Sequence, residues 1–546
     1  MNRVVVSAAR ILAKTLTRKS YVDFVRALET PRKNQMSLLR EILKMQAKTE
    51  YGQALGLTGN ENEAEFREKV PISDFDLGSL SGWIEKQKRY PDQAVLSPGG
   101  IVNFEKTSGS SGPHKLIPYN RALLNSFDKY FRIWLYDILT HGPKFESFRL
   151  YMSISPIFRS ESEIAQNIGL EDDSYYISSM LRLVMKYFFV VPTSLQKIQN
   201  PSIFFDLLCA YLAADEKLEI LSLWHPSLFL SIWDHLIQRR QFIAALLDGS
   251  KKISGFDIPK NLKAASLLSE RKLMTPMQLW PKLKFISAWD CSHSQQPAAN
   301  VQNIFPHVYF QGKGLLATEA PMTLPLIDCG TLPFISDVLF EFIDDFGKYC
   351  WIDEIQAGFE YSLVLSQKGG LIRYKIGDRI RVGTSNVGNT PSLEFIGREN
   401  ETSDLVGEKI TSSFLESFDR EFSRISHGSY YTFLPVLKKG PRYVLLVEKV
   451  SDDSGLIFSK WWEDKLCQNY HYSYARKLSQ LDKLEVVSVP QLQKKLLDFY
   501  SKKKSMKLGD VKLKRLFINP QTAEEFLVFS DIAVGHSDPL LFVRNI

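Results

Sequence analysis

The sequence predicts a two-domain chain that combines α/β and α+β organisation. Apolar residues recur at helical spacing through much of the first half. Short β-rich runs separated by Gly, Pro and Asp turns follow Trp280-Pro281, and strand-like and helix-like segments alternate near the C-terminus. The polar segment Glu399-Asn400-Glu401 has no hydrophobic face, so we place a boundary there. We therefore expect a large N-terminal domain at residues 1–397 and a smaller α+β domain at residues 398–546.

Composition narrows the class of protein. The 546 residues are 44% hydrophobic and 24% charged, as in soluble globular proteins and unlike disordered chains. The net charge of +7 is a mild bias that suits an anionic small ligand. Because basic and aromatic residues do not cluster, we expect no nucleic-acid partner. No apolar run approaches the ~18 residues of a membrane span, so stable membrane insertion is not expected either.

The first half of the chain is predicted to be mainly helical. Spacing from Arg10 to about Gln53 predicts two amphipathic helices that meet near Thr30-Pro31. A short helix is expected at Leu80–Arg89, and helical periodicity dominates from Arg121 to Ile237, with breaks at prolines. The first twenty residues are basic and lack Asp and Glu. A frayed or docked helix is favoured there over a transit peptide or a surface-binding helix.

Later segments supply the strands. In the first domain we expect β-structure at Leu283–Trp289, Val308–Phe310, Glu360–Ser366 and Gly370–Tyr374. In the second domain, strands are expected at Tyr430–Pro435, Arg442–Val447 and Glu485–Val489, and helices at Leu415–Ile425 and Val489–Tyr500.

A Ser/Gly-rich loop is the first candidate for chemistry. It runs Thr107, Ser108, Gly109, Ser110, Ser111, Gly112, Pro113, His114, Lys115. Small residues let backbone N–H groups surround phosphate oxygens, hydroxyls add donors, and the lysine adds a positive charge. The loop is not a Walker A motif, and an ordinary surface linker is the alternative. Strand-like Val102 and Phe104 before it and apolar Leu116-Ile117 after it favour a tethered turn.

Two carboxylates stand out further along. In Leu315-Leu316-Ala317-Thr318-Glu319-Ala320, an apolar strand end would deliver Glu319, whose oxygens suit Mg²⁺; an acid at a helix N-terminus is the alternative. In Tyr374-Lys375-Ile376-Gly377-Asp378, a strand would end in a glycine turn that presents Asp378 to a ribose diol, and a plain turn aspartate is the alternative.

Basic residues near the boundary and the C-terminus are the last candidates. Arg398, in Phe395-Ile396-Gly397-Arg398-Glu399, either binds phosphate or caps a strand, and Gly407-Glu408-Lys409-Ile410 follows it. The basic stretch from Lys502 to Arg515 includes Lys512 and Lys514, with a solvated helix face as the alternative.

Several other readings are disfavoured. The five cysteines are dispersed and form no CxxC pair, which argues against a disulfide framework or a zinc site and favours a reducing cytoplasm. His225 and His293 are isolated and more consistent with structural roles, and the histidines show no metal-ligand spacing. The absence of a GxSxG motif excludes a serine-hydrolase elbow. A monomer is the default expectation.

Taken in order, these motifs resemble those of adenylate-forming enzymes, and further segments make the chain similar to the GH3 family of acyl acid amido synthetases. The additional segments are Lys48-Thr49-Glu50-Tyr51-Gly52, Val70-Pro71, Lys115-Leu116-Ile117-Pro118, Leu279-Trp280-Pro281-Lys282-Leu283 and Trp289. The resemblance spans roughly Arg32 to Phe517. It implies a firefly-luciferase-like architecture: a large N-terminal domain of helices, β-sheets and a β-barrel-like piece, and a smaller cap hinged at Arg398–Glu399. The active site would lie in the cleft between them.

The resemblance also implies a reaction that uses ATP and Mg²⁺. A carboxylic acid would attack the α-phosphate of ATP to give an acyl-adenylate and pyrophosphate, and an amine would then displace AMP to form an amide. By matching position, Thr107, Ser108, Gly109, Ser110, Ser111 and Lys115 would handle the phosphates. Ala317, Thr318 and Glu319 would meet the α-phosphate and Mg²⁺. Asp378 would hold the ribose with Tyr374 nearby, and Arg398 would contact ribose or phosphate. Lys512, with Glu319 and Lys115, would be catalytic.

Departures and alternatives remain. Thr107 and Pro113 stand where relatives often carry Ser and Gly or a charge, and the segment Gly509–Arg515 lacks the proline usual after the lysine, so Lys514 is an alternative to Lys512. An acyl-CoA ligase would share the first step, and a non-catalytic nucleotide- or acyl-binding protein is the third reading. The segments Tyr175–Phe189 and Met322–Pro333 suggest an apolar or aromatic acid. An amino acid as acceptor is implied by the family alone.

Overall fold

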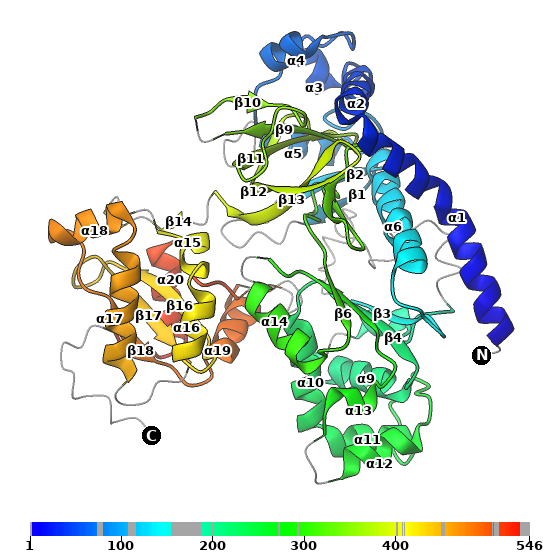
Figure 1. Ribbon diagram of the computed structural model, residues 1–546, viewed down its shortest axis with the longest axis vertical. Helices are drawn as coiled ribbons and strands as arrows, with labels where there is room; N and C mark the ends of the chain where they lie inside the picture. Colours follow the sequence, from blue (N-terminus) through cyan, green and yellow to red (C-terminus); the bar gives the residue numbers. More distant parts are fainter. Residues whose placement is uncertain are drawn as a thin grey trace. The chain divides into compact units, whose positions relative to one another are not determined.

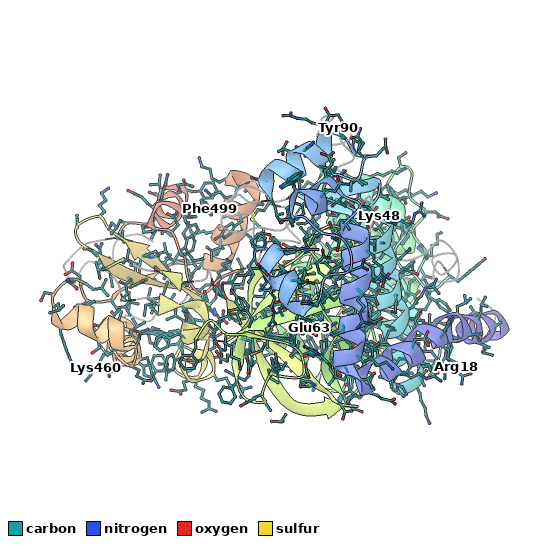
Figure 2. All side chains as sticks on the ribbon, turned by 90° about the horizontal axis from the view of Figure 1, so that it is seen from above. Arg18, Lys48, Glu63, Tyr90, Lys460 and Phe499 are labelled. Atoms are coloured by element: carbon teal, nitrogen blue, oxygen red, sulfur yellow. The ribbon has the colours of Figure 1, made fainter. Side chains whose placement is uncertain are left out.

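Two compact units make up the chain, Met1–Phe395 and Ile396–Ile546 (Figure 1). The computed structural model describes residues 3–73, 80–106, 116–153, 187–198, 200–270, 274–291, 294–344, 346–399, 402–403, 405–406, 408, 410–448, 454–504, 506, 511 and 513–534. Apolar side chains fill the interior of each unit. The charged side chains of Arg18 and Lys460, labelled in Figure 2, are exposed.

The first unit begins with the two predicted helices. Helix α1 (Arg3–Glu29) and helix α2 (Pro31–Gln46) meet at Thr30, because proline is accepted in the first turn of a helix and there fixes the start of α2. Helices α3 (Glu50–Ala54), α4 (Glu63–Lys69) and α5 (Ser81–Arg89) follow. The long helix α6 (Arg121–His141) packs along α1 (Figure 1).

A four-stranded parallel sheet has the order β3-β4-β5-β6. Its strands are β3 (Arg149–Met152), β4 (Leu218–Ser222), β5 (Phe285–Ala288) and β6 (Tyr309–Gly312). The connecting helices include α9 (Pro201–Ala214), α10 (Ser227–Gln238), α11 (Arg240–Asp248), α12 (Leu262–Ser269), α13 (Pro276–Leu279) and α14 (Gln295–Ile304), with a 3₁₀ helix at Thr193–Lys197. The helical expectation for Arg121–Ile237 missed β3 and β4, since a short strand buried on both faces has no alternation to reveal it.

An antiparallel sheet of order β10-β9-β11-β12-β13 lies in the same unit. It comprises β9 (Val338–Ile343), β10 (Tyr349–Cys350), β11 (Glu360–Gln367), β12 (Tyr374–Val387) and β13 (Thr390–Arg398). Two hairpins accompany it, β1 (Ile101–Lys106) with β2 (Leu116–Asn120), and β7 (Thr323–Leu326) with β8 (Gly330–Pro333). The predicted strand at Gly370–Tyr374 is wrong in its bounds, because β12 begins only at Tyr374. One apolar core joins α1, α2 and α6 to this sheet.

The second unit is an α+β domain with helices on both faces of a sheet. Its sheet pairs β16 (Tyr431–Val436) antiparallel with β17 (Arg442–Val447), and β17 parallel with β18 (Glu485–Ser488). The short β14 (Thr402–Ser403) pairs with β15 (Ile410–Thr411). The helices are α15 (Ser412–Glu416), α16 (Asp419–Ile425), α17 (Ser454–Leu466), α18 (Tyr470–Lys477), α19 (Leu492–Asp498) and α20 (Pro520–Phe529), with a π-helical turn at Phe499–Lys503.

Alternating strand residues build two cores in this unit. Phe433 and Leu445 point into one core around Trp462, whereas Leu434 and Val444 point into the other around Phe499. The three predicted strands are confirmed, while helices α17, α18 and α20 were not predicted. Over the part of the chain that the structure describes, no helix combines the length and apolar character needed to cross a membrane.

Candidate functional site

The β1–β2 hairpin frames the predicted phosphate loop. Lys106 pairs with Leu116 across the two antiparallel strands, so the chain is held immediately before and after the loop. The loop residues themselves lie outside the described residues: Thr107, Ser108, Gly109, Ser110, Ser111 and Lys115, with Gly112, Pro113 and His114. The prediction that strands flank this loop is confirmed.

Strand β2 connects this hairpin to the Thr318 segment. The Tyr119 hydroxyl donates a hydrogen bond to the carbonyl oxygen of Thr318 over 2.6 Å. Tyr119 is fully buried and its ring stacks on Phe127. The next residue, Asn120, donates through Nδ2 to the Lys368 carbonyl at 2.9 Å, and its Oδ1 accepts from the backbone of Leu123 at the start of α6. The strand that leaves the loop is therefore tied to two other segments of the same unit.

Thr318 and Glu319 lie at the tip of a tight chain reversal. The predicted strand end at Leu315-Leu316 is wrong: β6 stops at Gly312, and Leu316 forms an isolated bridge with Pro321. Gly314 has a φ of +60°, and a Cβ there would come within 2.4 Å of Thr323 Oγ1, so glycine permits the bend. Ala317 N donates to the Ala320 carbonyl at 3.2 Å and closes the reversal.

Glu319, the acidic residue of the reversal, is only 6% exposed. The backbone carbonyl of Glu319 accepts a hydrogen bond from Gln367 Nε2 at 3.3 Å, which fixes the tip against the end of β11. Two strands of different sheets thus hold consecutive carbonyls, Tyr119 on β2 that of Thr318 and Gln367 on β11 that of Glu319.

Tyr374 and Asp378 share one continuous strand. The expected strand end at Gly377 is wrong, because β12 runs on to Val387. Val364 pairs with Lys375 and Ser362 pairs with Arg379, so three residues of β12, Ile376–Asp378, stand opposite the single residue Leu363. This is a β-bulge, and Gly377 accommodates it with a φ of +82°. Tyr374 and Asp378 are 1% and 3% exposed, respectively.

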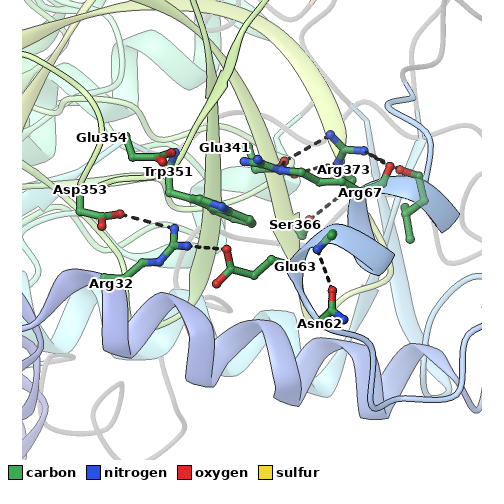
Figure 3. A network of polar contacts seen from close by, with 12 residues as sticks. Arg32, Asn62, Glu63, Arg67, Glu341, Trp351, Asp353, Glu354, Ser366 and Arg373 are labelled. Carbon is green, nitrogen blue, oxygen red and sulfur yellow. Dashed lines mark hydrogen bonds and ion pairs between the residues drawn. The ribbon is translucent and has the colours of Figure 1, made fainter.

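A buried arginine braces the start of β12 (Figure 3). Arg373, which precedes Tyr374, has a φ of +45° and donates through Nε to Glu341 Oε2 at 2.8 Å. Its Nη1 donates to the carbonyl oxygens of Val70 at 2.7 Å and Arg67 at 3.0 Å. Arg67 Nε also donates to Glu341, at 3.0 Å. Glu341 is 1% exposed, so these cations neutralise a carboxylate that water does not reach.

The Val70-Pro71 segment is part of this brace. Two residues later, Ser73 N donates to the Arg373 carbonyl at 3.0 Å, and Lys375 N donates to the Ser73 carbonyl at 2.9 Å. Ser73 therefore adds a short parallel bridge beside Tyr374. Arg67 lies 4.3 Å from the Trp351 ring, and Arg32 lies 5.0 Å from the same ring and pairs with Glu63 and Asp353 (Figure 3).

A surface cavity of about 630 Å³ lies next to that outer arginine. Its lining residues are Thr30, Pro31, Arg32, Lys33, Ile352, Asp353, Ile355, Ala357, Asn389 and Pro391. Its lining includes neither Thr318 nor Tyr374 nor Lys514, and Arg32 is already ion-paired, so we do not assign the chemistry to this cavity.

Another carboxyl group stands at the end of β6. Asp290 follows β5, and a Cβ on Gly312 would come within 2.3 Å of its Oδ1, so the carboxylate rests against that glycine. Burial raises the pKa of Asp290, whereas the hydrogen bond from the Cys291 thiol at 3.3 Å lowers it. The chain therefore leaves β6 towards Thr318 beside the Asp290 carboxyl group, whose pKa is raised.

The second unit carries the remaining predicted residues. Arg398 is exposed at the end of β13, and Lys512 lies outside the described residues. Lys514 is half-buried, and its carbonyl oxygen accepts a hydrogen bond from the Tyr430 hydroxyl at 2.9 Å. In the predicted Gly407–Ile410 motif, Glu408 is fully buried and accepts from the backbone of Leu405 and Val406 at 2.7 and 2.8 Å.

Two histidines were singled out from the sequence, His225 and His293. His225 follows β4, where Nδ1 and Ser227 Oγ are 2.6 Å apart in a local turn, as a structural histidine would be. His293 lies outside the described residues. Among the residues that the structure describes, no group of three or more His, Cys, Asp or Glu side chains is arranged to hold a metal ion.

Sequence reasoning missed the residues that support the site. They are Tyr119, Asn120, Glu341, Gln367 and Arg373. Asn120 directly precedes a long helix and has the side chain of an N-cap, a signal that was available. Arg373 adjoins Tyr374, but nothing in the sequence marks its partner Glu341.

Comparison with known proteins identifies the family of the chain. The GH3 family N-terminal domain matches residues 21–310, and the GH3 family central domain matches residues 332–398. The chain is 22% identical over 407 residues to the jasmonoyl–L-amino acid synthetase JAR4 of Nicotiana attenuata, which covers 67% of this chain and 69% of that protein.

Solved structures share the fold. The GH3.15 acyl acid amido synthetase superposes with a TM-score of 0.79 at 17% identity, covering 95% of each chain. A 2-hydroxyisobutyryl-CoA ligase gives a TM-score of 0.54 at 12% identity, covering 91% of this chain and 92% of that one. Because the family models together match well over half of the sequence and the fold agrees, the chain belongs to the GH3 family.

Proposed function

We propose that the protein is an ATP-dependent acyl acid amido synthetase. A carboxylate oxygen of the acid attacks the α-phosphorus of ATP, and the bond to the pyrophosphate leaving group breaks. The amine nitrogen of an acceptor then attacks the acyl carbon, the bond to AMP breaks, and the amine gives up a proton. The similar synthetases named above support this reaction and an amino acid as acceptor.

One contact in this chain is the main structural support for the proposal. The hydrogen bond from Tyr119 to the Thr318 carbonyl joins the strand that leaves the phosphate loop to the segment that carries Glu319. Gln367 joins that same segment to the strand preceding Tyr374. Three motifs that are distant in sequence are therefore linked within one unit, as a site that handles all parts of one nucleotide requires.

Each motif then takes a role. Backbone and hydroxyl groups of the loop would bind the phosphates, with Lys115 adding charge. Ala317 and Thr318 would contact the α-phosphate, Asp378 and Tyr374 would bind the nucleoside, and Arg398 would contact ribose or phosphate. Lys512, or Lys514, would stabilise the negative charge that develops during adenylation.

Glu319 is the residue suited to hold Mg²⁺ together with the nucleotide. Its carboxylate supplies hard oxygen donors, and it lies at the tip of a reversal held by two hydrogen bonds. When bound, the ion would neutralise phosphate charge. What the chain itself contributes is the fixed backbone of the residue that carries this carboxylate.

The remaining expectations belong to the same proposal. A domain boundary at residues 397/398 would let the smaller domain present its lysine in the first step and change orientation for the second. The dispersed cysteines support a reducing cytoplasm, and we retain a monomer as the starting assumption.

An acyl-CoA ligase is the competing function, since a CoA ligase shares the fold to a lesser extent. The discriminating experiment is a single reaction with purified protein, Mg-ATP, a mixture of carboxylic acids, all amino acids and CoA, analysed by mass spectrometry. An N-acyl amino acid with AMP supports the proposal, and an acyl-CoA supports the alternative. Failure to bind ATP would refute both.

A further inference from the structure

A buried arginine lies next to the candidate lysines of the second unit. The Arg515 side chain is 7% exposed, and its Nε and Nη2 donate to Asp419 Oδ2 at 3.3 and 3.2 Å. Its Nη1 donates to the carbonyl oxygen of Tyr431 at 3.2 Å. The rings of Tyr430 and Tyr431 lie 4.8 and 4.3 Å from the guanidinium carbon. The guanidinium is therefore fixed on several sides at once.

Its carboxylate partner is fixed as well. Asp419 stands in the first turn of α16, and the hydroxyl of Tyr431 donates a hydrogen bond to its Oδ1. Both oxygens of Asp419 are thus engaged, one by a tyrosine on β16 and the other by Arg515. The ion pair has little freedom to rearrange.

The residue that carries this guanidinium is also joined to strand β16 through its backbone. Phe433 N donates to the Arg515 carbonyl at 2.7 Å, Phe517 N donates to the Phe433 carbonyl at 2.8 Å, and Leu516 forms a parallel bridge with Phe433. The Lys514 carbonyl accepts from Tyr430, the residue that also stacks on Arg515. Two consecutive carbonyls are consequently held in place, that of Lys514 by Tyr430 and that of Arg515 by Phe433 of strand β16.

The stability of the fold does not require a buried ion pair such as that of Arg515 and Asp419. A buried ion pair often contributes no more to stability than apolar residues of similar volume, because both ions lose their hydration. What a forked guanidinium adds is direction, since it fixes the atoms around it in one arrangement. The buried charges of Arg515 and Asp419 are therefore better explained by a role in orienting the adjoining segment, which includes Lys514, than by a gain in stability.

We infer that Arg515 and Asp419 are positioning residues for the lysine of this segment and act selectively on the adenylation step. The inference rests on the proposed function, in which Lys512 or Lys514 meets the charge that develops at the α-phosphate. An ammonium displaced by a fraction of an ångström loses that contact. Attack of an amine on an acyl-adenylate already formed places no such demand on the lysine.

The same unit contains a matched control. Arg442 is also buried and donates through Nε to Glu485 at 2.9 Å, and through Nη1 to the Lys438 carbonyl at 2.7 Å. Arg442 pairs with Val436 at one end of β16, whereas Tyr431 lies at the other end of that strand. Arg442 therefore resembles Arg515 in burial and in ion pairing. Its contacts among the described residues do not include the lysine segment.

The test measures the two steps separately in the full-length chain. ATP–pyrophosphate exchange reports adenylation, with phenylacetate, benzoate, octanoate and jasmonate as probe acids, and amide formation from synthetic acyl-adenylates and a mixture of amino acids reports transfer. For Arg515→Lys and Asp419→Asn we expect exchange to fall about 10- to 100-fold while transfer stays within about twofold. Arg442→Lys and Glu485→Gln should leave both rates within about twofold.

A purely structural role predicts a different pattern. If folded Arg515→Lys and Asp419→Asn lose both steps equally, or neither, the inference is wrong. Should the single variants fail to fold, the double variant Arg515→Met with Asp419→Leu replaces the pair by apolar groups and must show the same selective loss. Wild-type protein that fails to bind ATP would overturn the proposed function and this inference with it, whereas an active wild type with unselective variants overturns the inference alone.

Discussion

The hydroxyl of Tyr119 and the carbonyl oxygen of Thr318 are 2.6 Å apart, although 199 positions separate the two residues in sequence. The donor Tyr119 is fully buried and stacks on Phe127, and leaving a buried hydroxyl unpaired is costly. It makes the position of the Glu319 reversal depend on the hairpin that frames the phosphate loop.

Removing the Tyr119 hydroxyl should weaken nucleotide binding and lower the stability of the fold only slightly. For Tyr119→Phe we expect a loss of about 1 kcal/mol in the free energy of unfolding and a rise in KM for ATP. Tyr211→Phe is the control, since Tyr211 donates to the Asp257 carbonyl at 3.0 Å in the same unit but in none of the motifs. Equal KM values for the two variants would count against the link between Tyr119 and the nucleotide.

The bulge in β12 gives a second prediction. Gly377→Ala meets no atom within 4 Å, so its cost comes from the φ of +82° alone and should be about 1–2 kcal/mol. Gly358→Ala has a φ of +85° and equally open space, and should cost the same. Only Gly377→Ala should impair adenylation, because it alone disturbs Asp378. Chemical denaturation and pyrophosphate exchange measure the two effects.

Asp378 itself should be needed for ribose binding. Loss of a charged hydrogen-bond acceptor costs about 1.5–3 kcal/mol, so Asp378→Ala should reduce kcat/KM for ATP by about 10- to 100-fold. Asp248→Ala, at an exposed helix end, should leave that constant unchanged. A normal kcat/KM in folded Asp378→Ala would remove Asp378 from the site.

The brace behind Tyr374 is expected to dominate stability. Arg373→Met would leave Glu341 buried with only part of its neutralising charge, so the free energy of unfolding should fall by about 3–5 kcal/mol. Arg381→Met breaks a half-exposed pair with Glu360 and should cost about 0–1 kcal/mol. Comparable melting temperatures for the two variants would show that the buried network is not a brace.

Protonation of Glu61 should account for part of the loss of folding stability at low pH. Burial raises its pKa, but the hydrogen bonds from Thr58 and the ammonium of Lys69 outweigh that effect and lower the pKa to about 2. Because the folded pKa lies below the ordinary value of 4.5, Glu61 stabilises the fold above pH 4.5, and this contribution disappears as the pH falls towards 2. Glu61→Gln should therefore be less stable at neutral pH and show a smaller loss between pH 4.5 and 2, measured by unfolding at a series of pH values.

The sequence allowed the type of most elements to be predicted, but not the contacts between them. Helices α1 and α2 follow from spacing and from Pro31, and the strands of the second unit follow from their β-branched and aromatic residues. Strands β3 and β4 were missed because burial on both faces removes the alternation that reveals a strand. The contacts of Tyr119, Arg373 and Arg515 join residues far apart in sequence, and local patterns carry no information about such pairs.

The bulge opposite Leu363 also determines which changes of chain length this strand tolerates. It adds two residues to β12, an even number, so Ile380 and Val382 still point into the core after it. Deleting one residue between Tyr374 and Arg379 would reverse the facing of every later side chain in the strand, whereas deleting two would restore it. Relatives of this chain should therefore differ here by pairs of residues, and single insertions should be confined to the loops.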